Sequence, residues 1–488
     1  MPSLKFFSEA VCLILNRFLT LELGMVKLHR RIIKLGVITA ILLGFVIPAK
    51  AQITGGSPVN SSAQVSSGFG GGGSEMKGKP SSRMSGLKVG SARFHGALDL
   101  EFGYDSNVFY SSGGDSDNDI GSIYLGFRPA ITIGNSEDID EKDFPKLLYD
   151  LVLGYSYKRY LQELSTRRDK DFHGANLGFL LQAFPKGTVS FDLHETFVRT
   201  SQPRYLPNNN NFDRDMNVVG AGLSYRPGGG LIDLRLGYRF AVDVFEASDL
   251  KHGNYYYHQP EFRAKWKFFP KTSFWLAATW QFISYFGSSE EIDYTNNDSR
   301  PIRVMTGVTG QFTPTLSFNA GIGYGYSWYQ GDAGSQYNLP IAMADMTWAV
   351  TPTAKLTLGY QHDFRDSMWG DYFMMDTAYL NYHHQIINKV DISATFRWIM
   401  AQYSGATLPT GFIGPGCTAP GEECDRTDNG VQVGLAVGYH ITNWVSARLG
   451  YTLYGNFTDF YTLSTVDNVS NDADFIKHLA YLNVNFAY

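Results

Sequence analysis

The sequence has little cysteine and little charge, and it holds one credible apolar segment of helical type. Three cysteines occur in 488 residues, and charged residues make up only 18% of the chain. Aromatic residues make up 15%, which is more than a disordered chain would carry. The net charge of −5 argues against a nucleic-acid binder, which needs a basic face. One apolar segment rules out a multi-span helical membrane protein, but it leaves open a membrane β-barrel, whose strands alternate.

The apolar segment has the features of a secretion signal. It follows a cluster of basic residues, is short for a membrane span, and ends in a small-x-small motif formed by Ala49 and Ala51. We therefore expect cleavage after Ala51, with residues 1–51 as the signal region and Met25 as an alternative start. Residues 52–90 are rich in glycine and serine and predict a flexible periplasmic linker.

Residues 91–488 repeat one pattern, in which apolar residues alternate with small or polar ones. In the first such segment, Leu98 and Leu100 share one face, and Asp99 and Glu101 share the other. About 18 segments of this kind follow one another, an even number that suits an antiparallel barrel. A soluble β-protein with one buried face would show the same alternation, and it is the alternative.

The connections and the aromatic residues favour the membrane barrel. Tight turns alternate with long polar loops, and aromatic residues gather near strand ends, as in outer-membrane barrels. The last strand ends in Tyr488 and resembles the terminal strand that the barrel assembly machinery reads. The predicted fold is an all-β, transmembrane, antiparallel up-and-down β-barrel of about 18 strands. It implies the outer membrane of a Gram-negative bacterium, with outer-membrane lipid and lipopolysaccharide as partners. The long loops are predicted at 105–119, 199–212, 286–300, 403–428 and 456–474.

Two acidic residues fit this pattern poorly. Glu195 and Asp376 both fall on the nominal lipid face of their strands. A position near a loop end, where the cost of a charge falls, would explain them. A β-bulge that switches the register is the alternative.

The inward face carries cations and anions in nearly equal number. Such a wall suits hydrated polar solutes better than it suits strict ion selection. Neighbouring strands also carry one local basic patch, which is interpreted either as a binding strip for an acidic polymer or as cross-strand pairing. We favour pairing with Asp233 and Glu261. The patch consists of Arg235, Arg239, Arg263, Lys265 and Lys267.

Glycines also cluster on the inward face, at Gly321, Gly323 and Gly325. They either widen the lumen locally or let large side chains of neighbouring strands fold over them. The sequence does not separate these interpretations.

Signatures of catalysis and of metal binding are absent from the sequence. The histidines accompany no nucleophile motif, and His383 and His384 point to opposite faces of a strand. The acidic stretch 115–119 resembles the start of a calcium loop but lacks its glycine and its bidentate glutamate. We expect no enzyme, no catalytic residue, no cofactor and no metal site.

Two cysteines lie close together in a Gly/Pro-rich stretch. Cys417 and Cys424 are seven residues apart. In an exported protein this spacing favours one small disulfide, and two free thiols are the alternative.

The first strand ends in the motif Gly103-Tyr-Asp-Ser-Asn-Val-Phe109. It resembles the Tyr-Asp-x-Asn-Val-Tyr/Phe stretch that opens a β-barrel porin family linked to exopolysaccharide biosynthesis operons. The resemblance implies a signal-bearing outer-membrane barrel that releases polysaccharide, with export components as partners. Asp105 and Asn107 would then lie at the lumenal rim and cap the first long loop. Ser106 and the glycine-rich leader depart from the family pattern.

The expected function is a passive channel for polar solutes, with secreted polysaccharide as the leading cargo. A general or nutrient-uptake porin would share every feature described so far. A third alternative is a structural or adhesive barrel whose lumen is plugged by loops such as 403–428.

Overall fold

The computed structural model describes the chain from residue 86 onward, with gaps in several loops. The predicted signal region, the glycine-rich segment up to residue 85 and Cys417 lie outside the described residues, as does the side chain of Cys424. The cleavage site and the disulfide therefore stay predictions. The described residues are 86–108, 110, 121–136, 144–161, 171–200, 213–246, 248–287, 297–330, 336–367, 370–407, 412–413, 423–459, 461–463, 470–472 and 474–488.

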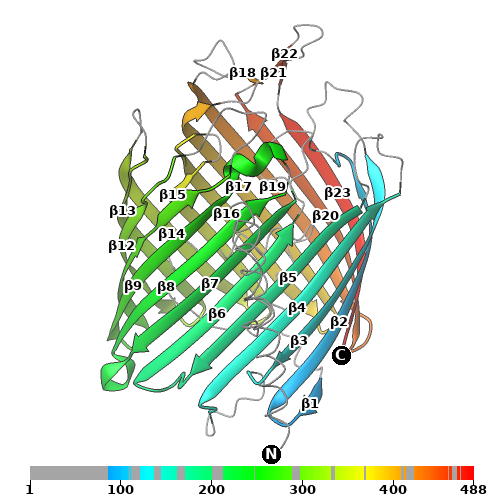
Figure 1. The fold of residues 1–488 in the computed structure, drawn as a ribbon. Coiled ribbons are helices and arrows are strands. Elements are labelled where there is room, and N and C mark those ends of the chain that lie inside the picture. The colour runs from blue at the N-terminus through cyan, green and yellow to red at the C-terminus, as the bar shows by residue number, and fades with distance from the viewer. Residues whose placement is uncertain are drawn as a thin grey trace, which may run out of the picture. The chain divides into compact units, whose positions relative to one another are not determined.

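One antiparallel sheet closes on itself to form a barrel of 18 wall strands, as predicted (Figure 1). Here β10 and β11 count as one wall strand, because both pair with β9. The wall consists of β2 (Ala92–Asp105), β3 (Ser122–Gly134), β4 (Leu147–Tyr160), β5 (Asp171–Ala183), β6 (Val189–Thr200), β7 (Arg214–Tyr225), β8 (Ile232–Phe245), β9 (Tyr255–Phe269), β10 (Thr272–Trp280), β11 (Phe282–Tyr285), β12 (Ile302–Thr313), β13 (Leu316–Ser327), β14 (Tyr337–Thr351), β15 (Ala354–Asp366), β16 (Tyr372–Ile387), β17 (Val390–Thr407), β19 (Glu423–His440), β20 (Val445–Thr458) and β23 (Phe475–Ala487).

The barrel closes where its first and last wall strands meet. β2 pairs with β23 from Ala97 opposite Ala487 to Asp105 opposite Leu479. Beyond the ladder, the backbones of Gly96 and Tyr488 exchange two further hydrogen bonds. Closure pairs the first wall strand with the last, so the described wall has no open edge, which is what a lipid environment requires of a spanning sheet.

Four short strands lie outside the wall. β1 (Leu87–Val89) pairs with the start of β2, so the predicted linker ends before residue 87 rather than at residue 90. At the opposite, long-loop end, β18 (Phe412–Ile413), β21 (Tyr461–Leu463) and β22 (Ser470–Asp472) form a small separate sheet (Figure 1). The loop expected at 403–428 is therefore shorter than predicted, because β17 extends to Thr407 and β19 begins at Glu423.

Two short 3₁₀ segments complete the described secondary structure. η1 (Pro227–Gly230) forms the tight connection from β7 to β8, where Gly228 and Gly229 adopt positive φ. η2 (Ser248–Gly253) follows β8 at the long-loop end. In the part of the chain that the structure describes, no helix has the length and apolar character needed to cross a membrane.

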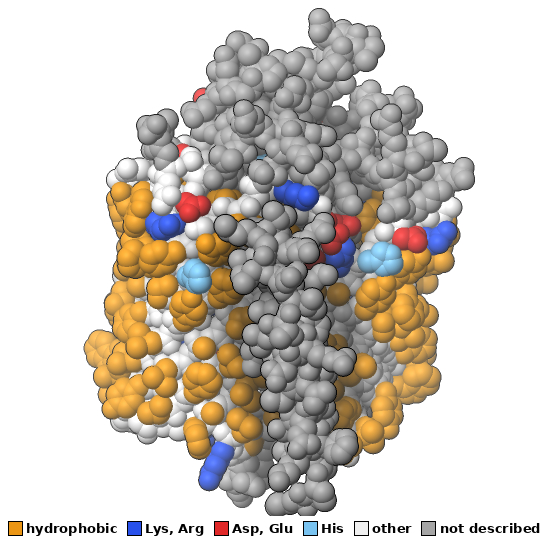
Figure 2. Space-filling model, in the orientation of Figure 1, with side chains coloured by type: hydrophobic (Ala, Val, Ile, Leu, Met, Phe, Trp, Pro, Cys, Tyr) orange, Lys and Arg blue, Asp and Glu red, His pale blue; other side chains and the backbone are white. Residues whose placement is uncertain are grey.

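The outward face of the wall is apolar, as the alternation predicts. Large side chains stay exposed there, such as Leu236 at 61% and Ile322 at 70%. Figure 2 shows these hydrophobic side chains as a broad band, with charged side chains near its edges. An apolar surface of this extent is typical of a lipid-facing barrel.

Glu195 and Asp376 do lie on the outward face, and both carboxylates have partners. Glu195 is only 5% exposed and accepts a hydrogen bond of 3.0 Å from Asn217 Nδ2. Asp376 accepts a hydrogen bond from Tyr360 and pairs with His362 Nδ1 at 2.9 Å. No register switch is needed to explain either residue, since the pairing of both strands is continuous there.

Tyrosine–histidine contacts recur on this outward face near the long-loop end. Three are direct hydrogen bonds to His Nδ1, and the fourth passes through the Asp376 carboxylate. We call these four contacts the Tyr–His belt. Figure 2 shows histidine side chains near the upper edge of the hydrophobic band. The belt consists of Tyr155–His173, Tyr238–His258, Tyr360–His362 and Tyr451–His478.

Candidate functional site

The inward faces of β8 and β9 carry the basic patch that the sequence predicts. In the β8–β9 ladder, Asp233 lies opposite Lys265, and Arg235 lies directly opposite Arg263. Directly opposed like charges destabilise a sheet, so the two guanidinium groups are expected to diverge.

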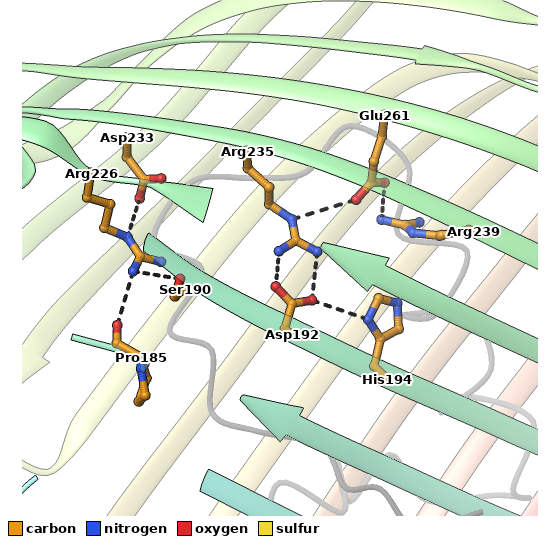
Figure 3. A network of polar contacts seen from close by, with 9 residues as sticks. All are labelled: Pro185, Ser190, Asp192, His194, Arg226, Asp233, Arg235, Arg239 and Glu261. Carbon is orange, nitrogen blue, oxygen red and sulfur yellow. Dashed lines mark hydrogen bonds and ion pairs between the residues drawn. The ribbon is translucent and has the colours of Figure 1, made fainter. Parts of the chain in front are cut away.

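Arg235 turns away from β9 and reaches across β7 to Asp192 on β6. Its guanidinium binds the carboxylate through both terminal nitrogens, with Nη2 and Oδ2 at 2.9 Å (Figure 3). The side chain passes over Gly222, where a Cβ atom would overlap the guanidinium. On its other side, Asp192 faces His194 Nδ1 at 3.6 Å. A glycine on the intervening strand thus permits an ion pair between strands that are not neighbours.

The Glu261 carboxylate joins the same network from β9. The Glu261 side chain leans over Gly237, the residue opposite it on β8. There its carboxylate contacts Arg239 Nη2 at 2.8 Å and Arg235 Nε at 3.8 Å (Figure 3). The predicted pairing of Glu261 is therefore with the two arginines of β8.

Asp233 has a partner that lies outside the predicted patch. Arg226, which follows β7, places its Nε 3.2 Å from the Asp233 carboxylate. Its Nη1 also donates to Pro185 O and to Ser190 Oγ, both at 3.0 Å (Figure 3). Sequence reasoning missed Arg226 because it belongs to a turn and carries no strand alternation.

The three cations of β9 differ from the arginines of β8 in their ion pairing. Within the described residues, neither Arg263 nor Lys267 forms an ion pair within 4.0 Å. Lys265 lies between them, faces Asp233 in the ladder and has a partner of its own. The pairing interpretation thus fits Arg235 and Arg239 but does not describe Arg263 or Lys267.

The inward glycines of β13 accommodate large neighbours. Cβ atoms at Gly321 and Gly323 would collide with the side chains of Trp275 and Met305, respectively. The Trp275 indole also donates to Asn319 Oδ1 at 3.0 Å. Of the two interpretations, the structure matches the one in which neighbouring side chains fold over the glycines.

Asp105, from the motif that ends the first strand, does more than cap a loop. Its Oδ1 accepts a hydrogen bond of 3.2 Å from the backbone N–H of Asn107, the local contact expected of a capping residue. Its Oδ2 lies 2.9 Å from Lys477 Nζ on the last strand and 3.9 Å from Lys158 Nζ. The Tyr160 hydroxyl donates to the same oxygen at 2.7 Å. Asp105 is fully buried, so the motif fastens the seam of the barrel.

The upper part of the β15–β16 hairpin leaves the wall. β14 pairs with β15 only as far as His362, whereas β15 and β16 stay paired up to Asp366 opposite Tyr372. Beyond His362, the Phe364 ring stacks on the Tyr337 ring with 3.8 Å between centroids. It also covers the inward-facing Gly325. We call the described residues of this segment, 363–367 and 370–375, the inward hairpin, because Phe364, Tyr372 and Met374 pack against the inner surface of β12–β14.

Polar contacts fasten the β15 strand of the inward hairpin near its base and at its tip. Arg303, on the inner face of β12, contacts Asp363 Oδ1 through Nε at 2.9 Å. At the tip, Asp366 accepts hydrogen bonds from Ser299 and from the Tyr329 hydroxyl. Asp366 ends β15 and lies beyond His362 of the Tyr–His belt, at the long-loop end of the barrel. Desolvation raises the pKa of the Asp366 carboxyl to about 7.

The described side chains offer binding surfaces built from paired charges. Across the described ranges, no group of three or more His, Cys, Asp or Glu side chains is arranged to hold a metal ion. Charged networks of this kind orient and bind polar solutes through ionic hydrogen bonds.

One family model matches part of the barrel. Residues 239–466 match the family model described as "Putative beta-barrel porin 2". No curated protein matches the chain.

Several solved structures match the chain at low similarity. OpdK of Pseudomonas aeruginosa, solved with vanillate, is 11% identical, with a TM-score of 0.40 over 81% of this chain and 99% of that one. OccK2 (OpdF) of the same species is also 11% identical, with a TM-score of 0.41 over 81% and 98%. The FrpB iron transporter of Neisseria meningitidis is 8% identical, with a TM-score of 0.42 over 83% and 82%. Similarities of this extent carry no argument about what the protein transports.

The family match covers the strands that carry Arg263, Lys265 and Lys267, and it extends beyond β20. The barrel closes completely and presents an apolar band outward. Over residues 239–466 the chain matches the β-barrel porin family, and it is an outer-membrane β-barrel of Gram-negative bacteria.

Proposed function

We propose that this protein is a passive outer-membrane channel for polar solutes and that secreted polysaccharide is its cargo. The observation that carries the proposal is the inner-wall network from β6 to β9, in which charges of both signs face the barrel interior. An 18-strand barrel is in the size class that can enclose an aqueous passage. Charges that are already paired within the wall attract hydrated sugars without holding them tightly.

The polysaccharide part of the proposal rests on the motif at Tyr104–Phe109. It is similar to the opening motif of the porin family linked to exopolysaccharide operons. In this chain, Asp105 fastens the barrel seam, so the motif supports assembly of such a barrel.

The inward hairpin favours a second candidate, a plugged structural or adhesive barrel. Its apolar side chains occupy part of the lumen along β12–β14. Single-channel recording separates the two candidates. Purified full-length protein in a planar bilayer should give discrete conductance steps if it is a channel. A silent bilayer, with the protein shown to be folded by heat-modifiable gel migration, would support the plugged barrel.

A cellular experiment then tests the cargo. Deleting the gene should lower the amount of polysaccharide at the cell surface, and the intact gene should restore it. Normal polysaccharide output together with impaired uptake of a small sugar would instead favour a nutrient-uptake porin. The two readouts come from the same strain, so each serves as the control for the other.

A further inference from the structure

A row of uncharged polar side chains crosses the inner wall from β14 to β17, away from the charged network of β6 to β9. Thr347 on β14 lies opposite Thr357 on β15, and Thr357 lies opposite Asn381 on β16. Asn381 in turn lies opposite Thr395 on β17. The row faces the lumen, because Phe396, the next residue after Thr395, is exposed on the lipid face and successive side chains alternate. Barrel strands tilt, so a row that follows the ladders also rises along the wall.

A second polar row runs beside the first, one inward position further from the short turns. On it, Tyr379 lies opposite Arg397, and Arg397 lies opposite Gln432. The Tyr379 ring leans across Gly359, where a Cβ atom would overlap it, and its hydroxyl donates a hydrogen bond to Asp345 on β14. We call the two rows together the polar face. It consists of Thr347, Thr357, Asn381, Thr395, Asp345, Tyr379, Arg397 and Gln432.

Three neighbouring members at the centre of the polar face are not used by the wall itself. Among the described residues, the side chains of Asn381, Thr395 and Arg397 form no hydrogen bond and no ion pair. Asn381 is exposed, and the other two are half-buried. The amide, the hydroxyl and the guanidinium together offer several donors and acceptors to a solute in the lumen. The arginines of the β6–β9 network differ in this respect, since Arg226, Arg235 and Arg239 bind carboxylates of the wall.

The charges of the polar face cancel. Asp345 and Arg397 are its two charged members and have opposite signs. The lower row is uncharged throughout and spans three intervals between strands, which is about 14 Å. A surface of this length and polarity suits an extended chain of hydroxyl groups better than a compact ion.

We infer that the polar face binds an uncharged saccharide chain. Sugar hydroxyl groups donate and accept hydrogen bonds, and the side chains of Asn381 and Thr395 do the same. The Arg397 guanidinium donates to neighbouring hydroxyl oxygens, and the Tyr379 ring offers an apolar surface to the C–H face of a sugar ring. An acidic chain would meet the Asp345 carboxylate on the same face. This inference rests on the proposed channel function and gives its cargo a chemical class.

The test compares two triple variants of the full-length protein that carry the same exchanges. T357V/N381A/T395V removes hydrogen-bonding groups from three consecutive strands of the polar face. The control, T132V/N176A/T196V, makes these exchanges on the inner faces of β3, β5 and β6. Isothermal titration calorimetry in detergent micelles measures binding of three probes of equal length. Two are neutral, a maltooligosaccharide and a cellooligosaccharide, and the third is an oligogalacturonate.

We expect the unmodified protein to bind at least one neutral probe more tightly than the oligogalacturonate. In T357V/N381A/T395V, the Kd for that probe should rise roughly tenfold or more, because three hydrogen-bonding groups are lost. The control should keep the Kd of the unmodified protein. Binding of neither neutral probe, or an equal loss in both variants, would overturn the inference. Tighter binding of the oligogalacturonate would overturn the uncharged class and assign the contact to Lys355, which borders the polar face on β15.

Planar-bilayer recording of the same proteins keeps the polar face separate from the channel. A protein that binds a neutral probe but never conducts would refute the proposed function and leave the polar face standing. A protein that conducts without binding either neutral probe would refute the polar face alone. Should the triple variant not fold, the exposed Asn381 allows the single change Asn381→Ala, which should weaken binding in the same direction. An unchanged Kd in folded Asn381→Ala would count against the polar face.

Discussion

Lys477 Nζ lies 2.9 Å from Asp105 Oδ2, so an ion pair ties the last wall strand to the first. The Asp105 side chain is completely buried, and the Tyr160 hydroxyl and Lys158 approach the same oxygen. The closing seam of the barrel is therefore held by a charged cluster in addition to the backbone ladder of β2 and β23.

Asp105→Asn should weaken this seam. Removing one partner of a buried ion pair leaves the other charge uncompensated, which costs about 3–5 kcal/mol. We expect a lower urea midpoint for unfolding in detergent micelles and heat-modifiable migration that is lost at a lower temperature. Asp99→Asn is the matched control, since an amide oxygen at position 99 still accepts the hydrogen bond of Asn483 across the seam and Arg128 keeps its ion pair with Glu101. Equal stability of the two variants would show that the seam does not depend on the Asp105 charge.

Gly222→Ala should disrupt the ion pair between Arg235 and Asp192. The added methyl group would occupy the space through which the guanidinium passes. Overpacking of this kind lowers the stability of the folded state by about 1–3 kcal/mol. The replacement of a strand glycine by alanine by itself raises that stability by a smaller amount. Urea unfolding checks the effect, with Gly96→Ala as the control because a Cβ there meets no atom within 4 Å. A Gly222→Ala variant as stable as the control would mean that Arg235 has another low-energy position.

Phe364→Ala should loosen the inward hairpin and raise single-channel conductance. The Phe364 ring stacks on Tyr337, and losing a buried phenylalanine costs about 3–5 kcal/mol. Phe396→Ala is the control, since Phe396 is 42% exposed on the lipid face of β17. If the larger conductance step occurs in neither variant, the hairpin does not narrow the conducting path.

The inward hairpin should also respond to pH through Asp366. Desolvation raises the pKa of Asp366 from 3.8 to about 7. The protonated carboxyl group therefore favours the state in which the hairpin is packed against the inner wall. Ser299 and Tyr329 donate to it, Arg303 attracts its charge and Asp371 repels it. The stabilisation of the packed hairpin is complete below 3.8, the ordinary pKa of this carboxyl group. It is lost as the pH rises through about 7, the pKa in the folded protein.

Conductance recorded at a series of pH values tests this dependence. We expect larger or noisier steps above about pH 7 than at about pH 5. Asp366→Asn resembles the protonated side chain and should give steps that no longer change over this range. A pH response that survives in Asp366→Asn would assign it to another group.

The strand alternation predicts the barrel well, because each face of a wall strand meets a uniform environment. It predicts the outward position of Glu195 and the inward position of Arg235. It does not predict that Arg235 binds Asp192, since that contact depends on the space above Gly222. To predict a contact between β6 and β8, one must know how each of these strands is aligned with β7. The sequence pattern of a single strand does not specify this alignment.

The inward hairpin shows where alternation misleads. Phe364 and Met374 occupy the positions that face lipid lower on the same strands, and their sequence pattern is the same. They pack instead against the inner wall, because β14 stops pairing with β15 beyond His362. An apolar face predicts only that the side chains are removed from water. Lipid hydrocarbon and the apolar inner wall of the protein both provide such an environment.

The Tyr–His belt has a consequence for how the protein sits in its bilayer. Its histidines lie near the starts of β5, β9 and β23 and near the upper end of β15, at the long-loop side of the barrel. Sinking the barrel further would carry these polar rings into hydrocarbon, and raising it would expose the apolar band to water. The outer surface thus sets the immersion depth, and with it the height at which the long loops stand above the cell.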